Sequence, residues 1–280
     1  MSTAKKSPHD IKNFDEIRLD PIAHFHKEQH PQFIASIARG LEILRCFSSS
    51  QQLLGNQELS HMTQLPKPTV ARITSTLVAL GYLKQPQHSS KYMLDVGVLA
   101  LGYAALANIS VRNLAYPYME AMARYAQAPV ALATRDRLNM IYLEVVHTEV
   151  SLTMRRPVGS SLPIHSSAIG RACLAAMEEK ERLYIFDAIA TRHPEDWPQI
   201  KINLEQAVQD YQDYGYCLSL GEWSKDVNSV AVPLVHSQHG ILVFNCGAPN
   251  YLLNREKLAQ DIGPRLVHMV NNIAEGLTIL

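Results

Sequence analysis

The sequence has few of the features that mark secreted, membrane or metal-binding proteins. Its four cysteines form no CxxC pair, which excludes a zinc knuckle and a thioredoxin-like motif. No apolar run approaches the ~20 residues that a membrane-spanning helix needs. The N-terminal segment also lacks the apolar core of a signal peptide. We therefore expect a cytoplasmic protein with no membrane contact, no metal site and no cofactor.

The sequence also lacks net charge, but its charges are unevenly distributed. Residues 1–94 contain 11 Lys and Arg against 7 Asp and Glu, whereas residues 95–280 contain 15 against 19. A basic N-terminal part suits a negatively charged partner such as DNA. A basic stripe beside a neutral remainder fits a regulator better than a nonspecific DNA coat.

The stretch 53–94 carries the pattern of a winged helix-turn-helix. Two short helix patterns flank a tight turn at residues 64–66, and a strand–turn–strand pattern follows as the wing. Pro68 suits the first turn of the second helix, where a missing N–H has no cost. The apolar residues of this helix recur at spacings of three and four and therefore share one face: Val70, Ile73, Leu77 and Leu80.

The opposite face of the second helix carries short hydrogen-bonding side chains and one guanidinium. This chemistry suits base edges in the DNA major groove, because Arg pairs well with guanine and Ser or Thr can bond to several bases. The alternative is a solvated face, which would usually carry Lys and Glu. The polar residues of the wing could contact DNA phosphates, which position a protein without reading sequence. The alternative is a plain hairpin that makes no such contact. The predicted DNA-binding residues are Lys67, Thr69, Arg72, Ser75, Thr76, Lys84 and Lys91.

The pattern divides the chain into four segments. Residues 1–32 form a polar tail, residues 33–94 the winged helix-turn-helix domain, and residues 95–110 an Ala-rich linker helix that is too apolar for a flexible linker. Residues 111–280 alternate helix and strand patterns with hairpins, which indicates an α+β domain around a mostly antiparallel sheet. The apolar faces at 33–47 and 95–110 suit burial between subunits, so we expect a homodimer or a dimer of dimers.

The polar tail contains a third of the twelve histidines: His9, His24, His26 and His30. A metal-sensing tail is one interpretation, but these spacings match no structural metal site. We expect a solvated, partly disordered tail instead.

Several ordered motifs resemble the IclR family of bacterial transcription regulators from about Phe33 to Leu277. They are ARGLEIL, LPKPTVARITSTLVALGYL, KYMLDVGVLALG, VGSSLPIHSSAIGRACLA and GYCLSLGEW…VAVPL…HGILVFNCGAP. The resemblance implies an N-terminal winged helix-turn-helix and a C-terminal domain, similar to GAF and PAS folds, that binds a small effector. It also implies dimers, often paired, that bind double-stranded operator DNA. The opening FIASIARGLEIL resembles the branch that regulates aromatic-acid (β-ketoadipate) degradation.

The resemblance places the effector between the start of LPIHSSAIG, the segment after GYCL and the last strand ILVFNCG. A helix N-terminus offers unpaired N–H groups and a partial positive charge, which suit a carboxylate. The alternative is that Ser166 or Ser167 only caps its own helix. The predicted effector-binding residues are Ser166, Ser167, Ala168, Leu220, Glu222, Ser229, Phe244 and Cys246.

The sequence departs from the family pattern in this region. Where many relatives have acidic residues, the chain retains only Glu222, and where some relatives use serines on the last strand it has Phe244 and Cys246. A pocket that contains Phe244 and Leu220 would be dry and restrictive, which argues against a small hydroxylated acid such as glyoxylate. It favours either a flatter, more apolar acid or a site partly filled by its own side chains. The alternatives are that Phe244 belongs to the ordinary core and Cys246 is a small buried hydrophobe.

Two other classes of function compete with an effector-controlled regulator. His165 and Ser167 could belong to a hydrolase, but the chain has no GxSxG turn and no evident third partner, so we expect no enzyme. A DNA-binding regulator with a non-functional ligand pocket is the second alternative. The large C-terminal domain argues against it, because DNA binding alone does not need so many additional residues.

Overall fold

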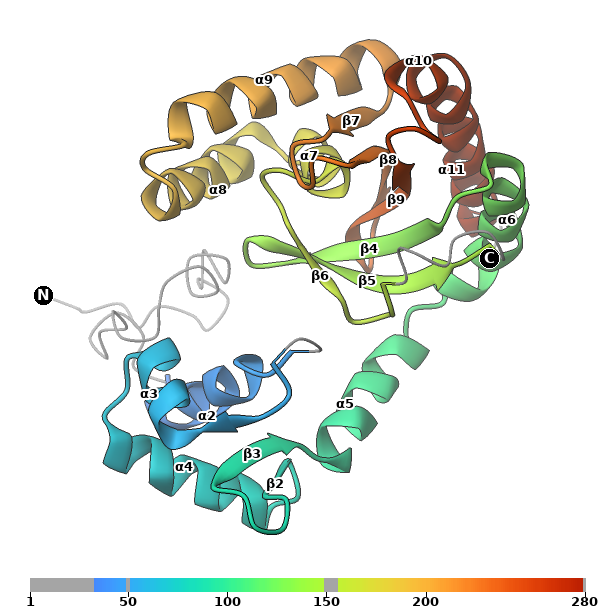
Figure 1. Cartoon of the computed structure of the whole chain (residues 1–280). Helices are drawn as coiled ribbons and strands as arrows, with labels where there is room; N and C mark the ends of the chain where they lie inside the picture. Colours follow the sequence, from blue (N-terminus) through green and yellow to red (C-terminus); the bar gives the residue numbers. More distant parts are fainter. Residues whose placement is uncertain (1–32, 49–50, 149–155, 279–280) are drawn as a thin grey trace, which may run out of the picture. The chain divides into compact units, whose positions relative to one another are not determined.

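The computed structural model describes residues 33–48, 51–148 and 156–278, which belong to two compact units. The first unit ends at Asn108 and the second begins at Ile109 (Figure 1). The predicted tail, with its four histidines, lies outside the described residues. By length and apolar composition no single described helix could cross a membrane, and only the helices α5 (Val96–Ala107) and α6 (Val111–Ala126), taken together as a bent pair, meet those criteria.

The N-terminal unit is built from short helices and a small antiparallel sheet in the order β1-β3-β2. Its elements are α2 (Ala35–Arg45), β1 (Leu54–Gly55), α3 (Asn56–Thr63), α4 (Lys67–Ala79), β2 (Leu83–Lys84), β3 (Lys91–Leu94) and α5 (Val96–Ala107). Helices α3 and α4 with the β2–β3 hairpin form the predicted winged helix-turn-helix.

Local chemistry sets the turn between α3 and α4. Glu58 caps the start of α3, because its carboxylate accepts a hydrogen bond from the Gly55 N–H at 2.6 Å, as in a capping box. The helix ends at Gln64, which has a left-handed backbone conformation and donates from its side chain to the His61 carbonyl at 2.6 Å. Pro66 directly precedes α4, and Pro68 occupies its first turn as predicted.

The buried side of α4 differs from its predicted side. Val70 and Leu77 are buried, but Leu80 follows the end of the helix and is 63% exposed. Thr74 lies in the core instead, because its hydroxyl is hydrogen-bonded to the Val70 carbonyl at 3.0 Å and to the Asn56 amide oxygen at 3.2 Å. A polar residue can therefore complete an apolar helix face where its hydroxyl is satisfied locally.

The C-terminal unit has one six-stranded antiparallel sheet in the order β6-β5-β4-β9-β8-β7. The strands are β4 (Val130–Asp136), β5 (Asn139–Val146), β6 (Ser161–Pro163), β7 (Cys217–Leu220), β8 (Val227–His236) and β9 (Gly240–Pro249). The helices are α6 (Val111–Ala126), α7 (Ala168–Ala175), α8 (Glu179–Arg192), α9 (Trp197–Tyr214), α10 (Arg255–Lys257), the π-helix η3 (Leu258–Ile262) and α11 (Gly263–Thr278). The predicted α+β class is confirmed.

Helices cover both faces of this sheet. Helices α6 and α11 pack together and against one face, and α7 packs against the other, with α9 beyond it (Figure 1). Helices α10 and α11 are separated by η3, where the Tyr216 hydroxyl donates to the Ala259 carbonyl at 2.9 Å and the Tyr216 ring lies against Gly263. The packing of α7 against the sheet positions this helix beside the central strands.

Candidate functional site

The outward face of α4 carries the chemistry predicted for DNA contact. Because α4 buries Val70, Thr74 and Leu77, the direction opposite to them passes through Arg72 and Ser75. Four of the predicted residues on α4 are exposed, and one is half-buried at the side of the helix. The exposed residues are Lys67, Arg72, Ser75 and Thr76, and the half-buried residue is Thr69.

Both predicted wing lysines form ion pairs within the N-terminal unit. Lys84 Nζ lies 3.4 Å from Asp95 Oδ1, and Lys91 Nζ lies 2.7 Å from Glu58 Oε1. The hydrogen bond from Lys91 holds the pKa of Glu58 below its ordinary value. These pairs are solvent-exposed, and exposed pairs contribute little stability. A phosphate can therefore replace the carboxylate at either lysine at small cost.

A hydrophobic groove runs beside α4. Thr69, Arg72 and Thr76 line its polar side, and side chains of α2 and α5 complete it. The apolar lining residues are Ile37, Leu41, Leu44, Ile73, Leu77, Leu80, Tyr82 and Leu101. Helix α5 buries none of its residues, and Val96, Leu99 and Tyr103 are each at least 70% exposed. Continuous apolar exposure of this kind marks an interaction surface.

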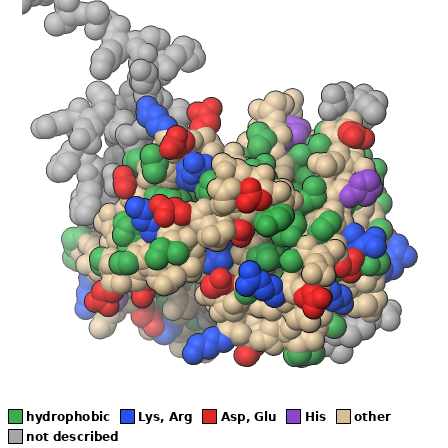
Figure 2. All heavy atoms as spheres, turned by 90° about the horizontal axis from the view of Figure 1, so that it is seen from above, with side chains coloured by type: hydrophobic (Ala, Val, Ile, Leu, Met, Phe, Trp, Pro, Cys, Tyr) green, Lys and Arg blue, Asp and Glu red, His purple; other side chains and the backbone are tan. Residues whose placement is uncertain are grey.

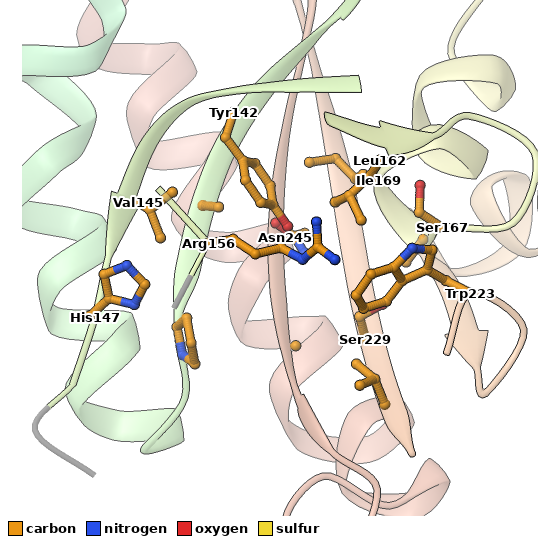
Figure 3. A pocket seen from close by; sticks show the side chains of 15 residues that line it. Tyr142, Val145, His147, Arg156, Leu162, Ser167, Ile169, Trp223, Ser229 and Asn245 are labelled. Carbon is orange, nitrogen blue, oxygen red and sulfur yellow. The ribbon is translucent and has the colours of Figure 1, made fainter. Parts of the chain in front are cut away.

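The C-terminal unit contains a cavity of about 50 Å³ between the sheet and the start of α7 (Figure 3). Most of its wall is apolar or aromatic, with a few polar side chains directed inward, which is the usual composition of a small-molecule site. The lining residues are Pro129, Ala131, Tyr142, Val145, His147, Arg156, Leu162, Ser167, Ala168, Ile169, Trp223, Val227, Ser229, Asn245 and Gly247.

Arg156 supplies positive charge to this cavity. Its guanidinium carbon lies 4.4 Å from the centre of the Trp223 ring, in cation–π geometry. Among the described residues, Arg156 forms no ion pair with a carboxylate. Burial raises the pKa of the nearby Tyr142 to about 12, so its hydroxyl keeps its proton at physiological pH. The cavity thus combines one cation with a neutral hydroxyl.

The start of α7 contributes less than the sequence predicted. The Ser167 hydroxyl accepts the Gly170 N–H at 3.2 Å and donates to the Pro163 carbonyl at 2.6 Å. Ser167 therefore caps its own helix, which was one of the two roles considered from the sequence. Ser167 and Ala168 also line the cavity. The Ser166 side chain is not among the lining residues, and its carbonyl accepts a hydrogen bond from Ser219 at 2.8 Å.

Glu222 stabilises the loop that carries Trp223. Its Oε1 lies 3.0 Å from Arg171 Nη1, and its Oε2 accepts hydrogen bonds from Ser219 and from the Leu220 N–H. Burial alone would raise the pKa of Glu222, but the charge and hydrogen bonds of Arg171 and the backbone lower it below its ordinary value. Glu222 is thus an anion paired with the buried Arg171, outside the cavity lining.

Five predicted effector-binding residues do not line this cavity. Ser166, Leu220 and Glu222 lie outside it, as do Phe244 and Cys246, which point to the other face of the sheet. The cause is the alternation of side chains along β9: Asn245 and Gly247 face the cavity, so their neighbours face away. Phe244 is fully buried between its strand partners Leu132 and Val232. Ser167, Ala168 and Ser229 do line the cavity.

The sequence analysis missed the polar residues that do face the cavity, namely Tyr142, His147, Arg156 and Asn245, together with Trp223. Alternation on the last strand was the available signal for Asn245. Elsewhere, within the part of the chain that the structure describes, no cluster of His, Cys, Asp or Glu could hold a metal ion.

Comparisons with known proteins identify the family. The model described as "Bacterial transcriptional regulator IclR C-terminal" matches residues 103–275, which is more than half of the chain. The chain belongs to the IclR family. The family's "IclR helix-turn-helix domain" matches residues 36–87. This IclR-family chain is therefore a DNA-binding transcriptional regulator with an effector-binding C-terminal domain, which confirms the prediction.

Individual relatives agree with the IclR assignment. The chain is 34% identical over 250 residues to the HTH-type transcriptional regulator TsaQ1/TsaQ2 of Comamonas testosteroni, with 88% of this chain and 90% of the relative covered. It resembles the crystal structure of an IclR family transcriptional regulator from Brucella abortus at 56% identity and a TM-score of 0.87, covering 92% and 98% of the two chains. An IclR homolog from Microbacterium hydrocarbonoxydans, crystallised with 4-hydroxybenzoate, shares the fold at 18% identity and a TM-score of 0.63, covering 86% and 99%.

Proposed function

We propose that this IclR-family regulator binds a small organic acid in the cavity and that Arg156 holds the carboxylate. The observation that carries the proposal is the Arg156 guanidinium, which borders an apolar cavity and has no carboxylate partner among the described residues. Arg binds carboxylates well, because its planar fork can donate two parallel hydrogen bonds. The Tyr142 and Trp223 rings suit the flat body of an acid.

Arg156→Met tests this role, with Arg192→Met on the exposed surface of α8 as the matched control. A ligand that binds only the folded state at 100 times its Kd stabilises the protein by about 2.7 kcal/mol. We expect a panel of benzoate, 4-hydroxybenzoate, propionate and lactate to contain acids that raise the Tm of wild type and Arg192→Met but not of Arg156→Met. The 4-hydroxybenzoate complex of the Microbacterium homolog motivates the aromatic members.

Trp223 gives an independent readout at the same site. The chain has two tryptophans, and Trp197 packs on Phe186 with ring centres 5.9 Å apart. In a Trp197→Phe background, the fluorescence of Trp223 should change on binding. If no acid changes the Tm or the fluorescence, the protein is a regulator whose C-terminal pocket takes no organic acid.

For DNA, we propose that α4 enters the major groove of an operator and that Lys67, Lys84 and Lys91 hold phosphates. The exposure of Arg72, Ser75 and Thr76 supports base contact. On the face shown in Figure 2, positive and negative side chains are interspersed, so that face has no strongly basic patch. The excess of positive charge in residues 1–94, with 11 Lys and Arg against 7 Asp and Glu, supports the N-terminal part of the chain as the one that binds DNA.

For assembly, we propose a homodimer, or a dimer of dimers, that buries the apolar side chains of α2 and α5 between copies and leaves Arg72 and Thr76, at the polar side of the groove, exposed for DNA. Leu101→Glu places a charge on this surface, where Leu101 is 60% exposed, and should shift the protein to monomers in light scattering. Val235→Glu is the matched control, because Val235 is equally exposed on the β8–β9 hairpin. A wild-type monomer at micromolar concentration would contradict the proposal.

We further propose that the chain has no catalytic role and that its domains follow the predicted bounds, with residues 33–94 binding DNA, 95–110 linking and 111–280 binding effector. The His165 and His193 rings pack with their centres 4.6 Å apart and their planes tilted by 45°. The Ser167 hydroxyl is committed to its helix cap. Neither side chain therefore forms part of a nucleophile–base pair.

A further inference from the structure

The cavity contains an unsatisfied hydrogen-bond acceptor. Asn245 on β9 is 8% exposed and lines the cavity beside Tyr142 and Arg156 (Figure 3). The Asn245 amide lies close to the Tyr142 hydroxyl and opposes the rise in the pKa of that group, yet its Oδ1 is buried without any hydrogen-bond partner among the described residues. Most buried polar groups are paired, so an unpaired one at a ligand cavity indicates a missing partner.

The two strands that flank β9 offer no side-chain donor to this oxygen. In the register of the sheet, Asn245 lies between Ala131 of β4 and Ala231 of β8. Alanine side chains have no polar hydrogen to donate, and the backbone N–H groups of these strands form the hydrogen bonds between strands. Two residues further along β9, Gly247 leaves the floor of the cavity open, since a Cβ there would lie 2.9 Å from Ser229 Cβ. The space above Asn245 is therefore left for a ligand group.

We propose that Asn245 Oδ1 accepts a hydrogen bond from a hydroxyl group of the effector, so that the protein selects hydroxy acids over the corresponding unsubstituted acids. The inference rests on the proposed function, in which Arg156 holds the carboxylate, and adds a second polar contact within the same cavity. It also replaces the sequence-based expectation of a purely apolar acid, because Phe244, on which that expectation depended, faces away from the cavity.

Selection follows from the cost of leaving Asn245 unpaired. A site that is built to hydrogen-bond a hydroxyl rejects the analogue without it, because the buried acceptor stays unsatisfied when that analogue binds. A methoxy analogue fills the same space but has no hydrogen to donate, so it separates a donor requirement from a requirement for size.

Isothermal titration of the wild-type protein provides the first test. The ligands are benzoate, 3- and 4-hydroxybenzoate and 4-methoxybenzoate, with propionate and lactate as a shorter pair. In one of the two series we expect the better hydroxy acid to bind about tenfold more tightly than the acid that lacks the hydroxyl. The methoxy acid should gain nothing over benzoate.

Asn245→Leu provides the second test, since it keeps the branched shape and the number of heavy atoms and removes the acceptor together with the amide donor. It should reduce the affinity for the preferred hydroxy acid by about tenfold and leave the affinity for the unsubstituted acid within about a factor of two. Asn228→Leu is the matched control. Asn228 is also a buried asparagine, on the neighbouring β8, but it donates to the Leu253 carbonyl and does not line the cavity.

The outcomes separate this inference from the proposed function. Equal affinities for hydroxylated and unsubstituted acids in the wild type would overturn the role of Asn245 and leave the role of Arg156 intact. Tighter binding of 4-methoxybenzoate than of 4-hydroxybenzoate would overturn the donor requirement. If no acid binds, the proposed function and this inference are both wrong. The titrations of different acids use only the wild-type protein, so they test the role of Asn245 even if Asn245→Leu does not fold.

Discussion

Helices α4 and α7 carry the predicted contacts of the two units, but they lie in opposite environments. Helix α4 buries three residues and presents one side to solvent, whereas every residue of α7 is buried. The partners of α4 are its sequence neighbours α2, α3 and β2, whereas those of α7 are helix α9 and strands of the sheet that lie far from it along the chain. A surface helix shows its functional side chains directly. A buried helix instead acts by positioning the elements around it.

The largest expected effect tests the tight burial of α7. A Cβ at Gly170 would lie 2.1 Å from the Ile164 carbonyl oxygen, which belongs to the backbone and has little freedom to move. Gly170→Ala should therefore destabilise the C-terminal unit by more than about 4 kcal/mol or prevent its folding. The free energy of unfolding is measured by denaturant titration followed by circular dichroism.

Gly276→Ala in α11 is the control for this substitution. A Cβ there would contact only the Leu114 side chain at 3.4 Å, and alanine favours a helix by up to about 1 kcal/mol over glycine. We expect a change in stability within about 1 kcal/mol. Similar midpoints for the two variants would show that α7 is packed no more tightly than α11.

The second prediction concerns the stability that comes from the partly buried ion pair between Arg171 of α7 and Glu222 in the loop that carries Trp223. Arg171 is 5% exposed and donates to the Leu218 carbonyl at 2.9 Å as well as to Glu222. Arg171→Met would leave Glu222 without its partner. The expected loss is about 2–3 kcal/mol, below that of a fully buried pair because a third of Glu222 is exposed.

The pH dependence of this loss has a definite sign. The pKa of Glu222 is lowered in the folded protein, so the contribution of the pair is present above the ordinary value of 4.5 and is lost as the pH falls through the lower folded value. The difference between wild type and Arg171→Met should thus shrink in acid. A difference that stays constant from pH 7 to pH 3 would exclude the ion pair as its cause.

The same contrast explains which parts of the molecule could be predicted from the sequence. The winged helix-turn-helix follows from local signals such as Pro68 and the periodic apolar residues, and its partners lie close in sequence. The cavity does not, because Tyr142, Arg156, Trp223 and Asn245 come from separate segments that only the sheet brings together. Motif resemblance predicted contacts at the start of α7 and on β9. Ser167 and Ala168 line the cavity, whereas Phe244 and Cys246 lie on the other face of β9, since a shift of one residue reverses the face of a strand.

The third prediction concerns DNA binding by the exposed face of α4. Arg72→Ala removes the guanidinium from the outward face of α4 and should reduce operator affinity by about 1–3 kcal/mol, with relaxed preference at one base position. Lys91→Ala should weaken binding to all sequences alike, since phosphate contacts carry no base information. Gel-shift titrations on specific and scrambled DNA measure both. Unchanged specific binding by Arg72→Ala would remove α4 from the major groove.

The smallest expected effect concerns Thr74, the one polar residue on the buried side of α4. Thr74→Val keeps the branched shape and removes the hydroxyl that bonds to the Val70 carbonyl and to Asn56. Because the Val70 carbonyl keeps its helical partner and Asn56 is only half-buried, water can compensate in part, and the loss should be about 1 kcal/mol. Ser75→Ala, one residue further on the exposed face, should change the stability by less than about 0.5 kcal/mol. Equal losses in denaturant titrations of the two variants would mean that α4 is not divided into a buried and an exposed side, and that its outward face is not free for DNA.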